Sequence, residues 1–142
     1  MTILVDTDVL VSFINRSESR HPQAAELLRR TWEGGWGAPI ITDFVLDEAL
    51  TLLMSRSARL DFADRLLKMA LEPLAPGANP LLPLVRVSDT AFAAAIPLYR
   101  RHFRRGLSFT DCTTLAVIAE RGVDLLASFD RGFDGLAARV GA

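Results

Sequence analysis

Two aspartates directly follow apolar runs that have the composition of buried strands. Asp6 follows "TILV" (residues 2–5), and Asp130 follows "DLLASF" (residues 124–129). A buried carboxylate without a partner is costly, so such positions need a reason. Ligands of parallel sheets bind beyond the carboxyl ends of the strands, and we therefore expect both side chains to line a site there. For Asp130, a turn with the two residues that follow is the alternative.

A second aspartate, Asp8, lies two residues after Asp6, with Thr7 between them. Either aspartate is a candidate cap for the helix that begins near Val9, because aspartate is a favoured N-cap residue. Asp8 fits that role better, since it directly precedes the apolar run. This leaves Asp6 for a functional role, whereas Asp8 is either a cap or a supporting partner of the site.

Glu48 lies in a segment with helical periodicity. Residues three and four apart share a helix face, which aligns Glu48 with Val45 and Leu52 and leaves Asp47 facing solvent. A carboxylate on an apolar face needs a partner, which is either a metal or one of the chain's fifteen arginines. The spacing therefore predicts that Glu48, and not its neighbour, points into the molecule.

Asp111 begins another helical segment. It aligns with Leu115 and Ile118, which predicts a position on the buried side. It also follows Ser108 at the spacing of a capping box. The two roles are compatible: Ser108 caps the helix while Asp111 lies in its first turn. A purely capping role is the alternative.

The four candidates, Asp6, Glu48, Asp111 and Asp130, predict a metal site if they meet at one edge of the sheet. Carboxylates crowded into one cleft repel one another strongly, and a divalent cation neutralises them. Hard cations such as Mg²⁺ prefer oxygen ligands and keep several waters. Such an ion activates a water and stabilises charge on a scissile phosphate. Both histidines are poorly placed for zinc, and the chain has a single cysteine.

Short apolar runs alternate with longer helical patterns along the chain. This alternation predicts an α/β fold in which helices cover both faces of a parallel sheet. A proline-rich stretch, residues 72–83, is expected to be a loop. Strands are expected at 2–5, 39–42, 83–87 and 124–129. Helices are expected at 22–33, from an Asp43 cap to about Arg56, at 62–71 after an Asp61 cap, from Ser88 or Asp89 to about Phe103, and at 109–122, where Gly122 closes the helix.

Composition limits the class of protein. A chain of 142 residues is long enough for a compact core, and we expect residues 1–142 to form a single domain. The net charge of −1 provides no general attraction for nucleic acid or anionic membranes. No apolar stretch approaches the roughly 20 residues of a membrane helix, and no basic segment precedes "ILV" as in a signal peptide. The single cysteine, Cys112, is expected in the core, and these features favour the cytoplasm.

Four segments resemble, in order and spacing, the PIN-domain family and in particular its VapC-type toxins of bacterial toxin–antitoxin pairs. They are "LVDTDVLV", "TDFVLDEAL", "LSFTDCTTLAVIAERG" and "LLASFDRGF", which span nearly the whole chain. The resemblance implies a three-layer α/β/α sandwich with a central parallel sheet of four to five strands. It also implies endoribonuclease activity that depends on Mg²⁺ or Mn²⁺. By position, the family's catalytic and metal-binding quartet is matched by Asp6, Glu48, Asp111 and Asp130, its supporting hydroxyl residue by Ser108, and its opening motif by Thr7 and Asp8.

The same resemblance implies partners. VapC-type toxins typically form homodimers and are blocked by a small antitoxin, here a VapB-like protein. Their substrates are usually structured RNAs such as tRNA or ribosomal RNA. The resemblance thus implies an RNA substrate and two kinds of protein contact, and no membrane.

Four arginines cluster before the helix that carries Asp111, in "YRRHFRRG" (residues 99–106). They are a candidate surface for RNA phosphates, although the helix dipole alone favours cations near a helix C-terminus. A nearby apolar stripe, Phe92, Ile96 and Tyr99, is expected to be core or dimer interface rather than a platform for stacked bases. The four candidate RNA-binding residues are Arg100, Arg101, Arg104 and Arg105.

Two other classes of function fit parts of the sequence. A haloacid-dehalogenase-like phosphatase also begins with an apolar strand and Asp-x-Asp, and it would use Asp6 as nucleophile and Asp8 as acid and base. That chemistry requires a lysine against the phosphate, and the only lysine, Lys68, lies within a predicted helix. A non-catalytic adaptor that docks a basic peptide in its acidic pocket is the second alternative. Metal-dependent cleavage of labelled RNA discriminates the nuclease from both.

Overall fold

The computed structural model describes residues 1–141, and within them five strands form one parallel sheet. The spatial order of the strands is β3-β2-β1-β4-β5, with all four neighbouring pairs parallel. The expected parallel sheet of four to five strands is confirmed. The strands are β1 (Thr2–Val5), β2 (Ala38–Thr42), β3 (Leu84–Val85), β4 (Leu125–Ala127) and β5 (Arg139–Val140).

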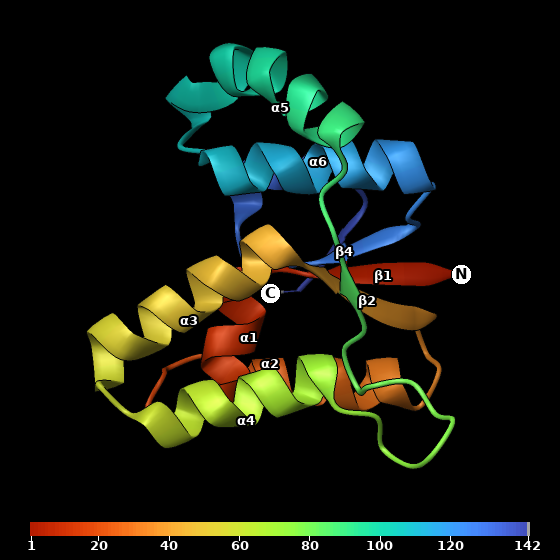
Figure 1. Cartoon of the computed structure of the whole chain (residues 1–142). Helices are drawn as coiled ribbons and strands as arrows, with labels where there is room; N and C mark the ends of the chain where they lie inside the picture. Colours follow the sequence, from red (N-terminus) through yellow and green to blue (C-terminus); the bar gives the residue numbers. More distant parts are fainter. Residues whose placement is uncertain (142) are drawn as a thin grey trace.

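Helices cover both faces of this sheet, which gives the expected three layers (Figure 1). On one side lie α1 (Thr7–Ile14), α2 (His21–Trp32) and α4 (Leu60–Leu71), and on the other α5 (Asp89–His102) and α6 (Phe109–Arg121). The longest helix, α3 (Asp43–Ser57), starts at the end of β2 and packs against α1, α4 and α6. None of the helices within residues 1–141 has the length and apolarity of a membrane span.

The central strand β1 divides the interior into two cores. Side chains alternate along a strand, so Ile3 and Val5 pack into the core beneath α1 to α4, whereas Leu4 packs into the core beneath α5 and α6. All three side chains are completely buried. Cys112 is also completely buried, in the second core, as expected. The end of β1 is therefore held by tightly packed neighbours on both faces.

Three of the predicted helix caps are wrong by one or two positions. The first helix starts at Thr7 rather than near Val9, and its N-cap is Asp6, not Asp8. The cap of α3 is Thr42 and not the predicted Asp43, and the Thr42 hydroxyl accepts the Val45 N–H at 3.0 Å. These helices start directly where their strands end, which local cap preferences alone do not reveal.

The third wrong cap is Asp61. Helix α4 follows Arg59, and Asp61 lies in its first turn, where it forms an ion pair with Arg59 at 2.6 Å. By contrast, Ser88 caps α5 and Gly122 ends α6 in a left-handed conformation, as predicted.

Strand lengths also differ from the prediction. The strands expected at 83–87 and 124–129 are shorter, and the proline-rich stretch 72–83 is irregular as expected. The strand β5 was not predicted, because its two residues, Arg139 and Val140, do not themselves form an apolar run. Pairing with β4 makes this segment a strand, and such pairing is not visible in the local sequence.

One glycine beside β2 is required by close packing. Gly37 has a φ of +92°, and a Cβ atom there would lie 2.5 Å from the carbonyl oxygen of Met1. Gly34 has a similar φ of +87° but open space around it. We expect Gly37→Ala to lower the free energy of unfolding by about 2–3 kcal/mol, and Gly34→Ala by about 1 kcal/mol. Urea unfolding measures both, and equal losses would contradict a steric role for the Met1 contact.

Candidate active site

Asp6 is the only residue between β1 and α1. Its backbone N–H donates to the Ala127 carbonyl of β4 at 2.9 Å. Its carboxylate is 4% exposed and accepts two hydrogen bonds, from the Thr7 N–H at 2.8 Å and from the Ser128 hydroxyl at 2.7 Å. Burial, followed by the charge of Asp8, raises the pKa of Asp6 well above its ordinary value. The expected position at the carboxyl end of a buried strand is confirmed, and the same residue also caps α1.

Ser128 connects two of the predicted site residues. Its hydroxyl donates to Oδ2 of Asp6 and accepts the backbone N–H of Asp130 at 3.0 Å. The residue is completely buried at the end of β4. Ser128 was not among the site residues predicted from the sequence. Its position two residues before Asp130 was the available signal, because alternate residues at a strand end face the same side.

Asp130 forms the turn that was expected as its alternative role, and its carboxylate also faces the other acidic residues. Its Oδ1 accepts the Gly132 N–H at 2.7 Å, which holds the short 3-10 helix Arg131–Phe133. Its charge contributes to raising the pKa of both Asp8 and Asp111. The turn and the acidic cluster therefore share this side chain.

Asp8 lies in the first turn of α1, and its Oδ2 accepts the Phe129 N–H at 3.1 Å. Its Oδ1 is buried and accepts no hydrogen bond from the described residues. The Thr7 hydroxyl is buried without a partner as well. Burial raises the pKa of Asp8 to about 6, and the charges of Asp130 and Asp111 add to this effect. Asp8 is therefore part of the acidic cluster and not the cap of α1.

The capping box at the start of α6 is present as predicted. The Ser108 hydroxyl accepts the Asp111 N–H at 3.1 Å, and the Ser108 N–H donates to Oδ2 of Asp111 at 2.8 Å. Asp111 is 8% exposed, so it also lies on the buried side, as its alignment with Leu115 indicated. Burial raises the pKa of Asp111 to about 6, and the charges of Glu48 and Asp130 raise it further.

The prediction for α3 is confirmed: Asp47 is exposed, whereas Glu48 is half-buried. Glu48 faces α6, where its charge acts on Asp111. No ion pair joins Glu48 to an arginine within residues 1–141, which removes the alternative role for this carboxylate in the described part of the chain. Glu48 thus joins the other acidic side chains without a cation of its own.

Five carboxylates thus influence one another where β1 and β4 end and where α1, α3 and α6 begin. They are Asp6, Asp8, Glu48, Asp111 and Asp130.

The donor set fits a hard divalent cation only in part. No three His, Cys, Asp or Glu side chains of residues 1–141 form a ready-made group that could hold a metal ion. Mg²⁺ requires less, because it is usually held by one or two carboxylates while waters complete its octahedron. The unpartnered Oδ1 of Asp8 and the mutual repulsion of the carboxylates both favour such an ion. A cation held by few protein ligands and several waters therefore suits this cluster.

One buried cation borders the cluster. The side chain of Arg139 is 11% exposed and binds Asp134 through Nε at 2.7 Å. Its Nη1 donates to the Ser128 carbonyl at 2.9 Å. The bond to Asp134 raises the pKa of Arg139, and the charges of Asp8 and Asp130 contribute to this shift. Arg139 thus offsets part of the negative charge and fixes the end of β4.

The four arginines of residues 99–106 are exposed, as a phosphate-binding surface requires. Arg105 has a structural role as well, because its Nη2 donates to the carbonyls of Gly132 and Asp134 at 2.9 and 2.8 Å. It therefore ties the end of α5 to the loop that follows Asp130. Arg104 lies over the ring of Phe103.

The apolar stripe on α5 is not part of the core. Phe92, Ile96 and Tyr99 are 44%, 37% and 42% exposed, so the expectation that they lie in the core is wrong. The expectation that they form a dimer interface stays a prediction. Phe92 and Tyr99 contact the ring of Phe109, which also faces Phe44 of α3.

Comparisons with known proteins match the family and the fold. The family model of the PIN domain matches residues 3–139. A VapC ribonuclease of Archaeoglobus fulgidus is 27% identical over 134 residues, which cover 94% of this chain and 80% of the relative.

Two solved structures extend the similarity. VapC20 of Mycobacterium tuberculosis, described as a sarcin-ricin loop cleaving toxin, has a TM-score of 0.74 at 25% identity and covers 93% of this chain and 92% of its own. VapBC2 of Rickettsia felis, bound to a DNA fragment from the promoter, has a TM-score of 0.69 at 16% identity and covers 99% and 98%. The second of these likenesses concerns the fold alone.

Proposed function

Because this chain belongs to the PIN-domain family, we propose that it is a metal-dependent endoribonuclease of the VapC type, which cleaves RNA phosphodiester bonds. The observation that carries the proposal is the gathering of buried acidic side chains at the ends of β1 and β4, with the pKa of three of them raised. The similarity to a VapC ribonuclease and to a sarcin-ricin loop cleaving toxin supports RNA as the substrate.

In this proposal, Asp6, Glu48, Asp111 and Asp130 are the catalytic residues and hold Mg²⁺ or Mn²⁺. Bound there, the ion supplies an activated water and offsets the negative charge that develops on the phosphate. The contribution of the other residues is positioning: Ser128 fixes one oxygen of Asp6, and Ser108 fixes one oxygen of Asp111. Thr7 and Asp8 support the cluster from the first turn of α1.

The proposal extends to the partners. Residues 1–142 would form a single PIN-like domain that acts as a homodimer in the cytoplasm. A small VapB-like antitoxin would block the acidic site, and tRNA or ribosomal RNA would be the target.

The direct test uses purified protein and labelled RNA, with Mg²⁺ or Mn²⁺ in one arm and EDTA in the other. Cleavage that requires the metal is the expected result. An acyl-phosphate trapped on Asp6 would instead favour the phosphatase alternative. Tight binding of a basic peptide without cleavage of any RNA pool would favour the adaptor.

A pair of neighbouring variants tests the orientation of α3. We expect Glu48→Gln to reduce RNA cleavage by at least about tenfold, because it removes a charge that faces the site. Asp47→Asn removes the same charge one residue away, on the exposed face, and should leave the rate unchanged. Initial rates with saturating Mg²⁺ measure both, and equal losses would contradict the orientation.

Arg104 is the better probe of RNA binding near α5, because Arg105 also holds the loop after Asp130. We expect Arg104→Ala to weaken RNA binding and to lower the slope of log Kd against log salt by about 0.7, the value for one lost phosphate contact on a single strand. Arg121→Ala, at the other end of α6, is the charge-matched control. An unchanged slope for Arg104→Ala would exclude a phosphate contact there.

A further inference from the structure

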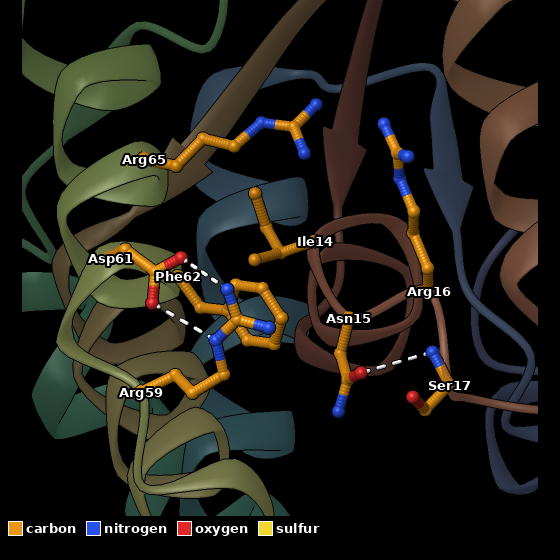
Figure 2. A pocket seen from close by; sticks show the side chains of 8 residues that line it. All are labelled: Ile14, Asn15, Arg16, Ser17, Arg59, Asp61, Phe62 and Arg65. Atoms are coloured by element: carbon orange, nitrogen blue, oxygen red, sulfur yellow. Dashed lines mark hydrogen bonds and ion pairs between the residues drawn. The ribbon is translucent and has the colours of Figure 1, made fainter.

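A cavity lies at the end of α1 that is remote from the acidic cluster, and we propose that it binds a phosphate group of the RNA away from the cleavage point. The identity of this ligand rests on the proposed function. The cavity has a volume of about 310 Å³. It is bordered by Asn15, Arg16 and Ser17 after α1, and by Arg59 and Arg65 from the start of α4 (Figure 2).

The charge around this cavity is positive. Arg59 is neutralised by Asp61, which it binds through Nη2 at 2.6 Å and Nε at 3.0 Å. Arg16 and Arg65 have no ion-pair partner within residues 1–141. Two guanidinium groups without an ion-pair partner therefore border this cavity, and that of Arg65 also lies over the ring of Phe13. Guanidinium groups match the oxygens of a phosphate in both geometry and charge.

A buried amide adds a donor to the same cavity. Asn15 is 8% exposed, and its Oδ1 accepts the Ser17 N–H at 3.0 Å. Its Nδ2 makes no hydrogen bond with the described residues. In Figure 2 this amide lies between Arg59 and Ser17. An amide NH₂ group only donates. It can therefore bind an acceptor in this cavity, as the oxygens of a phosphate are.

The position of the cavity favours RNA over an acidic protein. A neighbouring cavity of about 340 Å³ is bordered by Asp8 and Ser12 of α1 and by Glu18 and Arg56. The loop of residues 15–20 contributes to both cavities, so they lie in succession along α1. The helical rise of 1.5 Å per residue places Asn15 about 10 Å along the axis from Asp8. An RNA strand at the acidic cluster can thus extend over the cavity beside Asp8 to the cavity beside Asn15.

Two pairs of variants test this inference, with binding of a labelled single-stranded RNA measured in EDTA so that no cleavage occurs. Asn15→Asp keeps the acceptor for Ser17 but places a negative charge in the cavity, and Asn79→Asp makes the same change in the exposed loop 72–83. We expect Asn15→Asp to weaken RNA binding about tenfold, and Asn79→Asp to have no effect. Thermal unfolding of both variants shows whether they fold.

The second pair removes charge instead. Arg16→Ala with Arg65→Ala should raise Kd about tenfold and lower the slope of log Kd against log salt by about 0.7. Arg30→Ala with Arg121→Ala removes the same charge near the C-terminal ends of α2 and α6 and should change neither. Unchanged RNA binding by the cavity variants would overturn the proposal. A poly-glutamate peptide is the probe for an acidic protein partner, and variants that bind RNA normally but lose affinity for this peptide would overturn the proposal as well. If the unmodified chain binds no RNA even at low salt, the proposed function fails as well.

Discussion

Asp6→Asn should reduce RNA cleavage by at least about a hundredfold and raise the melting temperature of the metal-free protein. Asparagine has the size of aspartate, and its Oδ1 can still accept the Thr7 N–H that Asp6 accepts at 2.8 Å. The variant therefore keeps the cap of α1, but it removes the charge and puts an NH₂ group where Oδ2 accepts the Ser128 hydroxyl at 2.7 Å. Because burial and the nearby Asp8 make that charge unfavourable, its removal should raise Tm by a few degrees. Cleavage assays and thermal unfolding in EDTA measure the two effects.

The matched control is Asp47→Asn, which removes a carboxylate from the exposed face of α3. It should change neither the rate nor Tm. A variant Asp6→Asn that cleaves RNA at the normal rate would remove Asp6 from the catalytic set. A loss of both activity and stability would instead indicate that the bond from the Ser128 hydroxyl to this carboxylate matters more to the fold than the repulsion of its charge.

The second large effect concerns pH. The pKa of Asp8 and that of Asp111 are each about 6 in the folded protein, against an ordinary value of 3.8. Between pH 3.8 and about pH 6, the folded state thus binds more protons than the unfolded state. The free energy of unfolding therefore falls as pH rises through this range. For one group the loss is about 3 kcal/mol and is complete above about pH 6. Urea unfolding in EDTA should therefore show a less stable protein at pH 7 than at pH 4.5.

Mg²⁺ and Asp111→Asn each test the origin of this pH dependence. Excess Mg²⁺ at pH 7 should restore stability, by about 2.7 kcal/mol at a concentration one hundred times Kd. Asp111→Asn should flatten the pH dependence, while its Oδ1 still accepts the Ser108 N–H. The exposed ion pairs of Glu26, Asp61 and Asp134 act in the opposite direction, because the pKa of each is lowered and their contribution is lost as pH falls below the ordinary values of 4.5 and 3.8. A stability that rises from pH 4.5 to pH 7 without metal would contradict the assigned shifts.

Much of the site was predictable because its residues occupy positions where local pattern and topology agree. Asp6 and Asp130 follow apolar runs, and the parallel sheet brings the ends of those runs together. The orientation of Glu48 follows from helical periodicity, with Asp47 as an internal contrast.

The features that were missed depend on contacts between distant segments. The bond between Ser128 and Asp6 joins residues 122 positions apart, and nothing in the local sequence marks Ser128 as the donor. The role of Asp8 changed because it accepts the N–H of Phe129, at a similar separation. Local cap preferences assign a role from neighbours alone and cannot include such partners.

The junction between β1 and α1 has a consequence for how the site moves. Every polar group of Asp6 is engaged: its N–H with Ala127, its carbonyl with the N–H of Leu10, and its carboxylate with Thr7 and Ser128. Local fraying therefore cannot release this side chain, since its release requires β1 to separate from β4. The backbone amides of Asp6 and Leu10 should exchange hydrogen only as fast as the whole sheet unfolds. Partly unfolded forms of the chain consequently carry no intact acidic cluster.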